Sequence, residues 1–415
     1  MGKEHLKFVI VGHVDHGKST LIGRLFFDTG CLPKEKIEEV KKICDSLGKE
    51  LEFAYVMDHL EEERDQGITI DTAQTFFSTK KRDYVIIDAP GHREFTKNMI
   101  TGASQAEAAI LIVDAEEGVQ EQTKRHAYIL KMLGLDQVIV VINKMDLVNY
   151  DESRFKEVSK DIKEFLNKIG ANEPTYIIPI SAKEGDNVAK KSENMKWFEG
   201  MTILEALDTF KSKMDRSNLA LRMPVQDVYK IDDKRIIVGR VEAGTISEGD
   251  KVLILPTEEN AVIASVEEFL NPDKKKAVCG ESTGIVTKEK AFIDRGMVLS
   301  DKEDKPIVTS TVKANLFWMS KDPLRKGETV TLKCATEEAS CDIEKIEKRI
   351  DSSTFEVLEK DASELRNMEV GEVILKTNKE IIVDDFNKTP ELGRFVIEKG
   401  LDTAGGGIII MGEEK

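Results

Sequence analysis

Apolar residues in the first half of the chain fall into short runs separated by amphipathic stretches. Four of these runs are predicted to be strands: 8–11, 84–87, 138–142 and 176–180. The clearest helical pattern spans residues 153–169, where apolar residues recur every three or four positions. Strands that alternate with helices indicate a mostly parallel sheet with helices on both faces, so we expect an α/β domain over residues 1–215.

The pattern changes beyond residue 221, where apolar runs are separated by turn signals and a helical period is scarce. The runs predicted to be strands are 236–241, 252–255, 308–316, 329–334, 373–376 and 395–398. We expect one β-barrel over residues 221–304 and a second over 305–415, divided at Lys305-Pro306. Gly405-Gly406-Gly407 is predicted to form a bulge or tight turn rather than a phosphate loop, because no helix follows it.

A glycine-rich motif, G-H-V-D-H-G-K-S, lies between the first predicted strand and a helix-compatible stretch. Backbone N–H groups of such a turn converge on one point and bind phosphate. Lys18 is predicted to reach the β- and γ-phosphates, and the Ser19 hydroxyl to ligate Mg²⁺. The predicted phosphate-binding residues are Gly12, His13, Val14, Asp15, His16, Gly17, Lys18, Ser19 and Thr20.

Three further motifs, each directly after a strand, predict that the base is guanine. Asp88-Ala89-Pro90-Gly91 offers a carboxylate that can hold Mg²⁺ through water, and Gly91 lets a backbone N–H approach the γ-phosphate. In Asn143-Lys144-Met145-Asp146, Asp146 can accept hydrogen bonds from guanine N1–H and the 2-amino group, while the Lys144 stem covers the base. Ser181-Ala182-Lys183 can offer a backbone N–H to guanine O6.

Two residues between these motifs are candidates for the chemical step. Thr69, in R-D-Q-G-I-T-I, is predicted to join Mg²⁺ through its hydroxyl only when a γ-phosphate is present. His92 directly follows the D-A-P-G turn, where it can orient the attacking water. On its own His92 would be read as an ordinary loop histidine, and only its place after D-x-x-G favours catalysis.

Composition limits the class of protein. A chain of 415 residues with 40% apolar residues predicts two or three domains, and no run reaches the roughly 18 apolar residues of a membrane span. A core strand begins within a few residues of the N-terminus, so we expect no signal peptide. Five cysteines without a C-x-x-C pair favour a reducing, cytoplasmic location over a disulfide or metal framework.

The formal net charge of −16 bears on the partners of the protein. A surface this acidic repels phosphate backbones unless a basic patch is segregated, and no long basic run supplies one. A patch assembled only by folding stays possible.

These motifs and the two β-rich regions resemble the translational GTPase superfamily, whose members are similar to elongation factor Tu/1A, over essentially the whole chain. Two branches fit. Three stretches resemble the large GTPase subunit of the heterodimeric sulfate adenylyltransferase: Gly23–Gly30, Met57–Gly67, and Val113–Ala115 followed by Gly118–Thr123 with Arg125 and His126. In contrast, His13, His16 and D-A-P-G-H-R resemble the factor that delivers aminoacyl-tRNA.

The acidic charge leads us to favour the sulfate branch. That resemblance implies GTP or GDP with Mg²⁺ on this chain, and GTP hydrolysis coupled to adenylyl sulfate formation. It also implies a small adenylyl-transferring partner subunit that binds most of the ATP and sulfate. Under the alternative, the partners are tRNA and the ribosome; a GTP-regulated scaffold is a third possibility.

Overall fold

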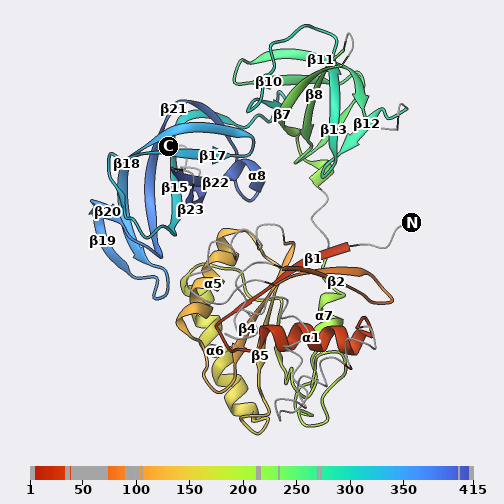
Figure 1. Ribbon diagram of the computed structural model, residues 1–415, viewed down its shortest axis with the longest axis vertical. Coiled ribbons are helices and arrows are strands. Elements are labelled where there is room, and N and C mark those ends of the chain that lie inside the picture. The colour runs from red at the N-terminus through yellow and green to blue at the C-terminus, as the bar shows by residue number, and fades with distance from the viewer. Residues whose placement is uncertain are drawn as a thin grey trace. The chain divides into compact units, whose positions relative to one another are not determined.

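The computed structural model describes residues 5–32, 73–88, 106–211, 216–231, 234–268, 273–400 and 402–410, and positions 38, 99, 103 and 271. The chain divides into two compact units, Met1–Lys213 with Ser352–Phe355, and Met214–Asp351 with Glu356–Lys415. Figure 1 labels helices and strands of both units. Thr69, Gly91 and His92 lie outside the described residues.

The first unit is built on a six-stranded sheet of order β2-β3-β1-β4-β5-β6, in which only β2 is antiparallel to its neighbour. The strands are β1 (His5–Gly12), β2 (Ala73–Ser78), β3 (Asp83–Asp88), β4 (Ala108–Asp114), β5 (Val138–Asn143) and β6 (Tyr176–Pro179). The central strands are buried almost throughout, as expected when helices cover both faces. The predicted parallel sheet is confirmed.

Four described helices pack on this sheet: α1 (Lys18–Thr29), α5 (Glu121–Met132), α6 (Glu152–Lys168) and α7 (Ile203–Leu207). Apolar residues of α1 and α7 form one core with alternate residues of β1, including Phe8 and Ile10. Helices α5 and α6 lie together on the other side of the sheet (Figure 1). The predicted helix over 153–169 corresponds to α6, which Asp151 caps by accepting the N–H of Ser153 at 2.9 Å.

The second unit begins with a closed barrel of order β10-β11-β13-β8-β7-β14. After the short 3₁₀ turn η3 (Arg216–Asn218), the strands of this region are β7 (Arg222–Ile231), β8 (Lys234–Arg240), β9 (Thr245–Ser247), β10 (Lys251–Leu255), β11 (Glu259–Glu267), β12 (Lys276–Val278), β13 (Ser282–Thr287) and β14 (Val298–Ser300). We refer to it as the first barrel, and it confirms the predicted β-barrel architecture.

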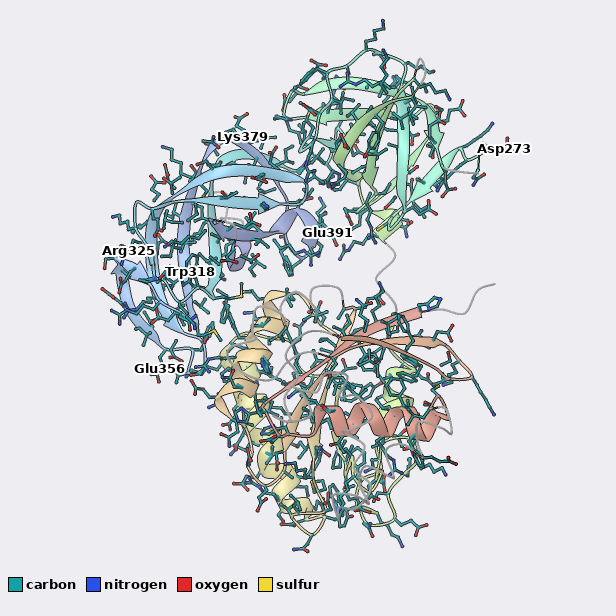
Figure 2. The ribbon with its side chains drawn as sticks, in the orientation of Figure 1. Asp273, Trp318, Arg325, Glu356, Lys379 and Glu391 are labelled. Atoms are coloured by element: carbon teal, nitrogen blue, oxygen red, sulfur yellow. The ribbon has the colours of Figure 1, made fainter. Side chains whose placement is uncertain are left out.

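The following region is a seven-stranded sheet of order β17-β22-β23-β15-β21-β18-β19, in which β17 also pairs with β18 and so joins the two sides. Its elements are β15 (Ile307–Trp318), β16 (Leu324–Arg325), β17 (Thr329–Cys334), β18 (Glu337–Asp351), β19 (Val357–Ala362), β20 (Glu364–Leu365), β21 (Glu369–Val383), α8 (Pro390–Gly393), β22 (Arg394–Lys399) and β23 (Asp402–Ile410). We call it the second barrel. Trp318, labelled in Figure 2, is fully buried in its core.

The tight turn predicted as one possibility at Gly405–Gly407 is not present, but the register of β23 against β22 shifts by one residue between Thr403 and Gly405, as in the β-bulge that was the other possibility. These glycines lie inside β23, paired with β15 on one side and β22 on the other. A Cβ on Gly407 would lie 2.4 Å from the carbonyl oxygen of Asn315 and 2.6 Å from the Phe395 ring. Close packing of neighbouring strands therefore explains the glycine at position 407.

The two barrels share one hydrophobic cluster, in which Leu253, Leu255 and Val298 of the first barrel meet Ile382 and Leu392 of the second. Beside it, the buried guanidinium of Arg222 donates from Nε to Asp384 Oδ2 at 2.7 Å and from Nη1 to the carbonyl oxygen of Asp304 at 2.7 Å. The second unit is thus held together across its two barrels by apolar packing and a buried ion pair.

A search of the described residues finds no helix with the length and apolar character needed to cross a membrane.

Candidate nucleotide-binding site

The turn between β1 and α1 has the conformation that a phosphate-binding loop requires. Gly17 precedes α1 with a φ of 91°, in the left-handed region that favours glycine. A Cβ at this position would also lie 2.4 Å from Asn143 Nδ2. Glycine is therefore required here both by the backbone and by the close approach of another loop.

Lys18 is folded into this turn. Its Nζ donates to the carbonyl oxygens of Gly12 at 3.1 Å and His13 at 2.8 Å, and the side chain is almost completely buried. Burial lowers the pKa of Lys18 to about 8, although the carboxylates of Asp88 and Asp15 oppose the shift. An ammonium held this way, beside a helix N-terminus, fits a phosphate group that would supply the missing negative charge.

Asn143 joins the phosphate loop to the Ser181-Ala182-Lys183 motif. Its Nδ2 donates to the carbonyl oxygen of His16 at 2.9 Å, and its Oδ1 accepts the N–H of Ala182 at 2.9 Å. All three groups are buried. The predicted contact of this motif with guanine O6 would therefore share the Ala182 N–H with Asn143.

Asp146 provides the test of whether guanine fits. Its Oδ1 is buried and has no hydrogen-bond partner within the described part of the chain. A buried carboxylate oxygen without donors is costly, and guanine N1–H and the 2-amino group would satisfy it. The residues present therefore fit a guanine base.

Of the described residues predicted to hold Mg²⁺, Ser19 lies in the first turn of α1 and Asp88 is the last residue of β3. Asp88 ends β3 and pairs in register with Ile10, two residues before Gly12, so it lies at the same edge of the sheet as Ser19. No cluster of three or more metal-ligating side chains occurs in the part of the chain that the structure describes.

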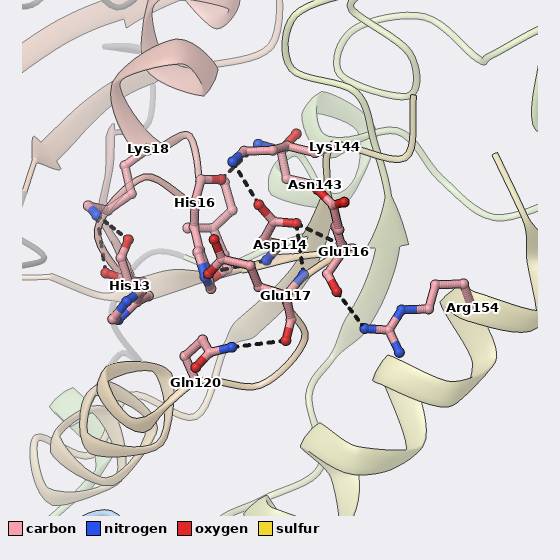
Figure 3. Close-up of polar contacts among 12 residues, drawn as sticks. His13, His16, Lys18, Asp114, Glu116, Glu117, Gln120, Asn143, Lys144 and Arg154 are labelled. Carbon is pink, nitrogen blue, oxygen red and sulfur yellow. Dashed lines mark hydrogen bonds and ion pairs between the residues drawn. The ribbon is translucent and has the colours of Figure 1, made fainter. Parts of the chain in front are cut away.

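His16 in the phosphate loop is fully buried and serves a structural role. His16 Nδ1 lies 3.2 Å from the backbone nitrogen of Asp114 and 3.4 Å from the carbonyl oxygen of Ile112, and Nε2 lies 3.3 Å from Glu117 Oε2. Burial and the neighbouring His13 lower the pKa of His16 to about 4, so the ring is neutral. His16 thus fastens the phosphate loop to the loop that follows β4 (Figure 3).

That loop contains functional residues that our sequence interpretation missed. The Asp114 carboxylate lies 2.7 Å from Lys144 Nζ, and Arg154 of α6 donates to the carbonyl oxygens of Ala115 at 2.7 Å and Glu116 at 2.9 Å (Figure 3). One signal was present in the sequence. Asp114, like Asp88 and Asn143, is a polar residue at the carboxyl end of a buried parallel strand.

Comparisons with known proteins agree with this geometry. The profile described as the elongation factor Tu GTP binding domain matches residues 3–237, elongation factor Tu domain 2 matches 234–300, and the GTP-eEF1A C-terminal domain-like family matches 311–410. Elongation factor 1-alpha of Natronomonas pharaonis is 40% identical over 99% of both chains. Elongation factor 1-alpha of Methanopyrus kandleri is also 40% identical, over 100% of this chain and 99% of the relative.

A solved structure described as Sup35 complexed with GDP aligns with 99% of this chain and 94% of that chain, at 25% identity and a TM-score of 0.46. This score is too low to support any argument.

The predicted role in sulfate activation is wrong. Curated relatives that match along their whole length are named elongation factor 1-alpha, among them that of Thermococcus kodakarensis, 40% identical over 98% of both chains. The predicted partner subunit, with its ATP and sulfate, is wrong for the same reason. The net charge, which favoured the sulfate branch, is a sum over the whole surface, whereas binding to phosphate depends on local charge.

Proposed function

Because this chain belongs to the elongation factor Tu/1-alpha-like family of GTPases, we propose that it is a cytoplasmic translation factor that delivers aminoacyl-tRNA to the ribosome. One observation carries the proposal. Identity to proteins named elongation factor 1-alpha runs through 98–99% of their length, so it includes both β-rich regions as well as the nucleotide-binding unit. A relationship limited to the GTP-binding domain would support only GTP binding.

In the nucleotide site, Lys18 would bind the β- and γ-phosphates, with the backbone of Gly12–Thr20 around them. Ser19 would ligate Mg²⁺ directly and Asp88 through water, and the metal when bound would neutralise charge on the phosphate oxygens. Asn143, Lys144, Asp146 and the Ser181–Lys183 loop would bind the base. For Gly91, Thr69 and His92, which lie outside the described residues, the roles near the γ-phosphate, on Mg²⁺ and in orienting water rest on the sequence alone.

The first barrel has an exposed surface that suits stacking on the unpaired bases at the end of a nucleic acid. Tyr229, Ile231 and Phe292 are each at least half exposed. Arg235 donates to the carbonyl oxygens on both sides of Phe292, at 3.3 Å to Ala291 and 2.5 Å to Ile293, and so brings that segment beside β7 and β8. Exposed aromatic rings next to basic side chains stack on unpaired bases, even on a protein whose net charge is negative.

Protection of aminoacyl-tRNA from spontaneous hydrolysis tests this function. We expect the GTP-loaded protein to slow hydrolysis of the aminoacyl ester and the GDP-loaded protein to protect it much less. The Asp146→Asn variant is the matched control, because it should protect with xanthosine triphosphate and fail with GTP. If GTP binds tightly and neither nucleotide state protects the ester, the chain is a GTPase with another partner.

A further inference from the structure

Lys144 of the N-K-x-D motif is tethered at its far end. Its backbone is left-handed, with a φ of 62°, and its Nζ lies 2.7 Å from Asp114 Oδ2. The Asp114 carboxylate is almost completely buried, whereas the lysine side chain keeps about 29% of its surface exposed. The ammonium is therefore anchored while the hydrocarbon stem remains accessible.

Asp114 is itself held rigidly. Its second carboxylate oxygen, Oδ1, accepts the backbone N–H of Glu116 at 2.7 Å and that of Glu117 at 3.3 Å, as in an Asx turn. Arg154 of α6 binds the carbonyl oxygens of this same turn, and the N–H of Gly118 donates back to the carbonyl oxygen of Asp114 at 2.9 Å. The carboxylate that faces Lys144 therefore cannot swing away without breaking the turn.

The Asp114 carboxyl group stays ionised at neutral pH. Burial on its own would raise the pKa of this carboxyl group. The hydrogen bond from Lys144 and the N–H donors of Glu116 and Glu117 together lower the pKa below its ordinary value. The ion pair with Lys144 is consequently present throughout the neutral range.

We propose that Asp114 is a positioning residue of the guanine site: it holds Lys144 beside the base and thereby slows nucleotide release. A long, flexible lysine would otherwise sample many rotamers, and ordering it when the nucleotide binds would reduce affinity. Since the same loop fastens His16 through Glu117, one rigid turn supports both the base side and the phosphate side of the site (Figure 3).

The inference rests on the proposed nucleotide site, in which Lys144 covers the base. Two variants of the full chain separate the two ideas. Lys144→Met keeps a stem of similar length but has no charge to pair with Asp114. Asp114→Asn keeps an oxygen for the Glu116 and Glu117 N–H groups, but presents an amide donor to the lysine.

The measurement is the rate at which a fluorescent GDP analogue dissociates. We expect Asp114→Asn to accelerate dissociation about tenfold, of the order expected for losing a hydrogen bond to a charged group. GDP and GTP should be affected by the same factor, because the change lies on the base side. In the Lys144→Met background, Asp114→Asn should have no further effect, because the group through which it acts is gone.

Glu152→Gln is the matched control. It removes the same charge from an exposed ion pair with Lys156 on α6, 2.7 Å long in the native chain, and should leave dissociation unchanged. Asp114→Ala also removes the turn's N–H acceptor, so it should accelerate dissociation more than Asp114→Asn.

The outcomes distinguish the positioning role of Asp114 from the guanine site itself. If Lys144→Met accelerates dissociation and Asp114→Asn changes it less than twofold, the positioning role is wrong and the guanine site stands. An equal effect of Asp114→Asn with and without Lys144 would also overturn the inference, because Asp114 would then act through the loop alone. If Lys144→Met itself has no effect, anchoring the lysine ammonium contributes nothing to nucleotide retention, and the positioning role of Asp114 is wrong.

Discussion

Replacing Asn143 by alanine tests the connection between the phosphate loop and the base loop. The native side chain makes two buried hydrogen bonds, each 2.9 Å long, to the carbonyl oxygen of His16 and the N–H of Ala182. The variant leaves both backbone groups buried without these partners. It also leaves space beside Gly17, where Asn143 Nδ2 now occupies the position a Cβ would need.

The magnitude follows from the two groups left unsatisfied. A buried backbone donor or acceptor without a partner costs about 1–3 kcal/mol, and some relaxation toward water is expected, so the total is about 2–4 kcal/mol. Part of this loss lowers the stability of the nucleotide-free protein. The rest appears as weaker nucleotide binding, because the bound state must hold both loops in place, and each ~1.4 kcal/mol corresponds to about tenfold in affinity.

We therefore expect Asn143→Ala to weaken GDP binding at least about tenfold in a calorimetric titration, and to lower the urea midpoint of the nucleotide-free protein. Asn172→Ala is the matched control, because Asn172 makes an exposed hydrogen bond of 2.7 Å to Asp136 in the same unit. If Asn143→Ala binds GDP within threefold of the native chain and unfolds at the same urea concentration, the connection between the loops contributes nothing and the reasoning is refuted.

Three further predictions concern the binding of the nucleotide and the protection of aminoacyl-tRNA. Asp146→Asn should weaken GTP by about 3 kcal/mol and favour xanthosine triphosphate, since the donor–acceptor match at position 2 of the base inverts; an unchanged GTP titration would contradict the assignment. Phosphate should raise the lowered pKa of Lys18, so GDP affinity should fall as pH rises above about 8, while guanosine affinity stays level; equal pH profiles would exclude Lys18 as the cause. Tyr229→Ala should weaken protection of aminoacyl-tRNA by about 1–3 kcal/mol with GTP affinity unchanged, and full protection by this variant would remove the ring from the binding surface.

The sequence predicts the fold well where periodicity is strong. The buried parallel strands follow from short apolar runs and the long helix α6 from a pattern that repeats over several turns. Their bounds agree with the structure to within one residue, except that β1 begins three residues earlier than predicted. The sequence did not predict that Gly405–Gly407 lie inside a strand, because a glycine run is typical of turns and bulges; the need for glycine at 407 comes from the neighbouring Phe395 ring and Asn315 carbonyl. Such a reason depends on strands that are distant in sequence.

The sequence predicted those residues of the candidate site that lie within recognisable motifs. Glycine, lysine and asparagine positions in the phosphate and base loops carry recognisable spacing, and the structure brings the described ones together. Asp114 and Arg154 were missed because their roles depend on a turn conformation and on the direction of side chains from a neighbouring helix. In the sequence, Arg154 is one more charged residue on an exposed helix face.

The junction between the barrels limits how this protein can be recombined with its relatives. Leu253 and Leu255 bury their side chains against Ile382 and Leu392. The guanidinium of Arg222 donates to Asp384 of the second barrel, to Asp304 and to the carbonyl oxygen of Leu221. A chimaera that imports one barrel alone would expose apolar surface and leave Asp384 buried beside a foreign side chain. Exchange between relatives should therefore succeed when residues 216–410 are transferred together. In this chain the pair of barrels, rather than either barrel alone, is the unit that can be exchanged.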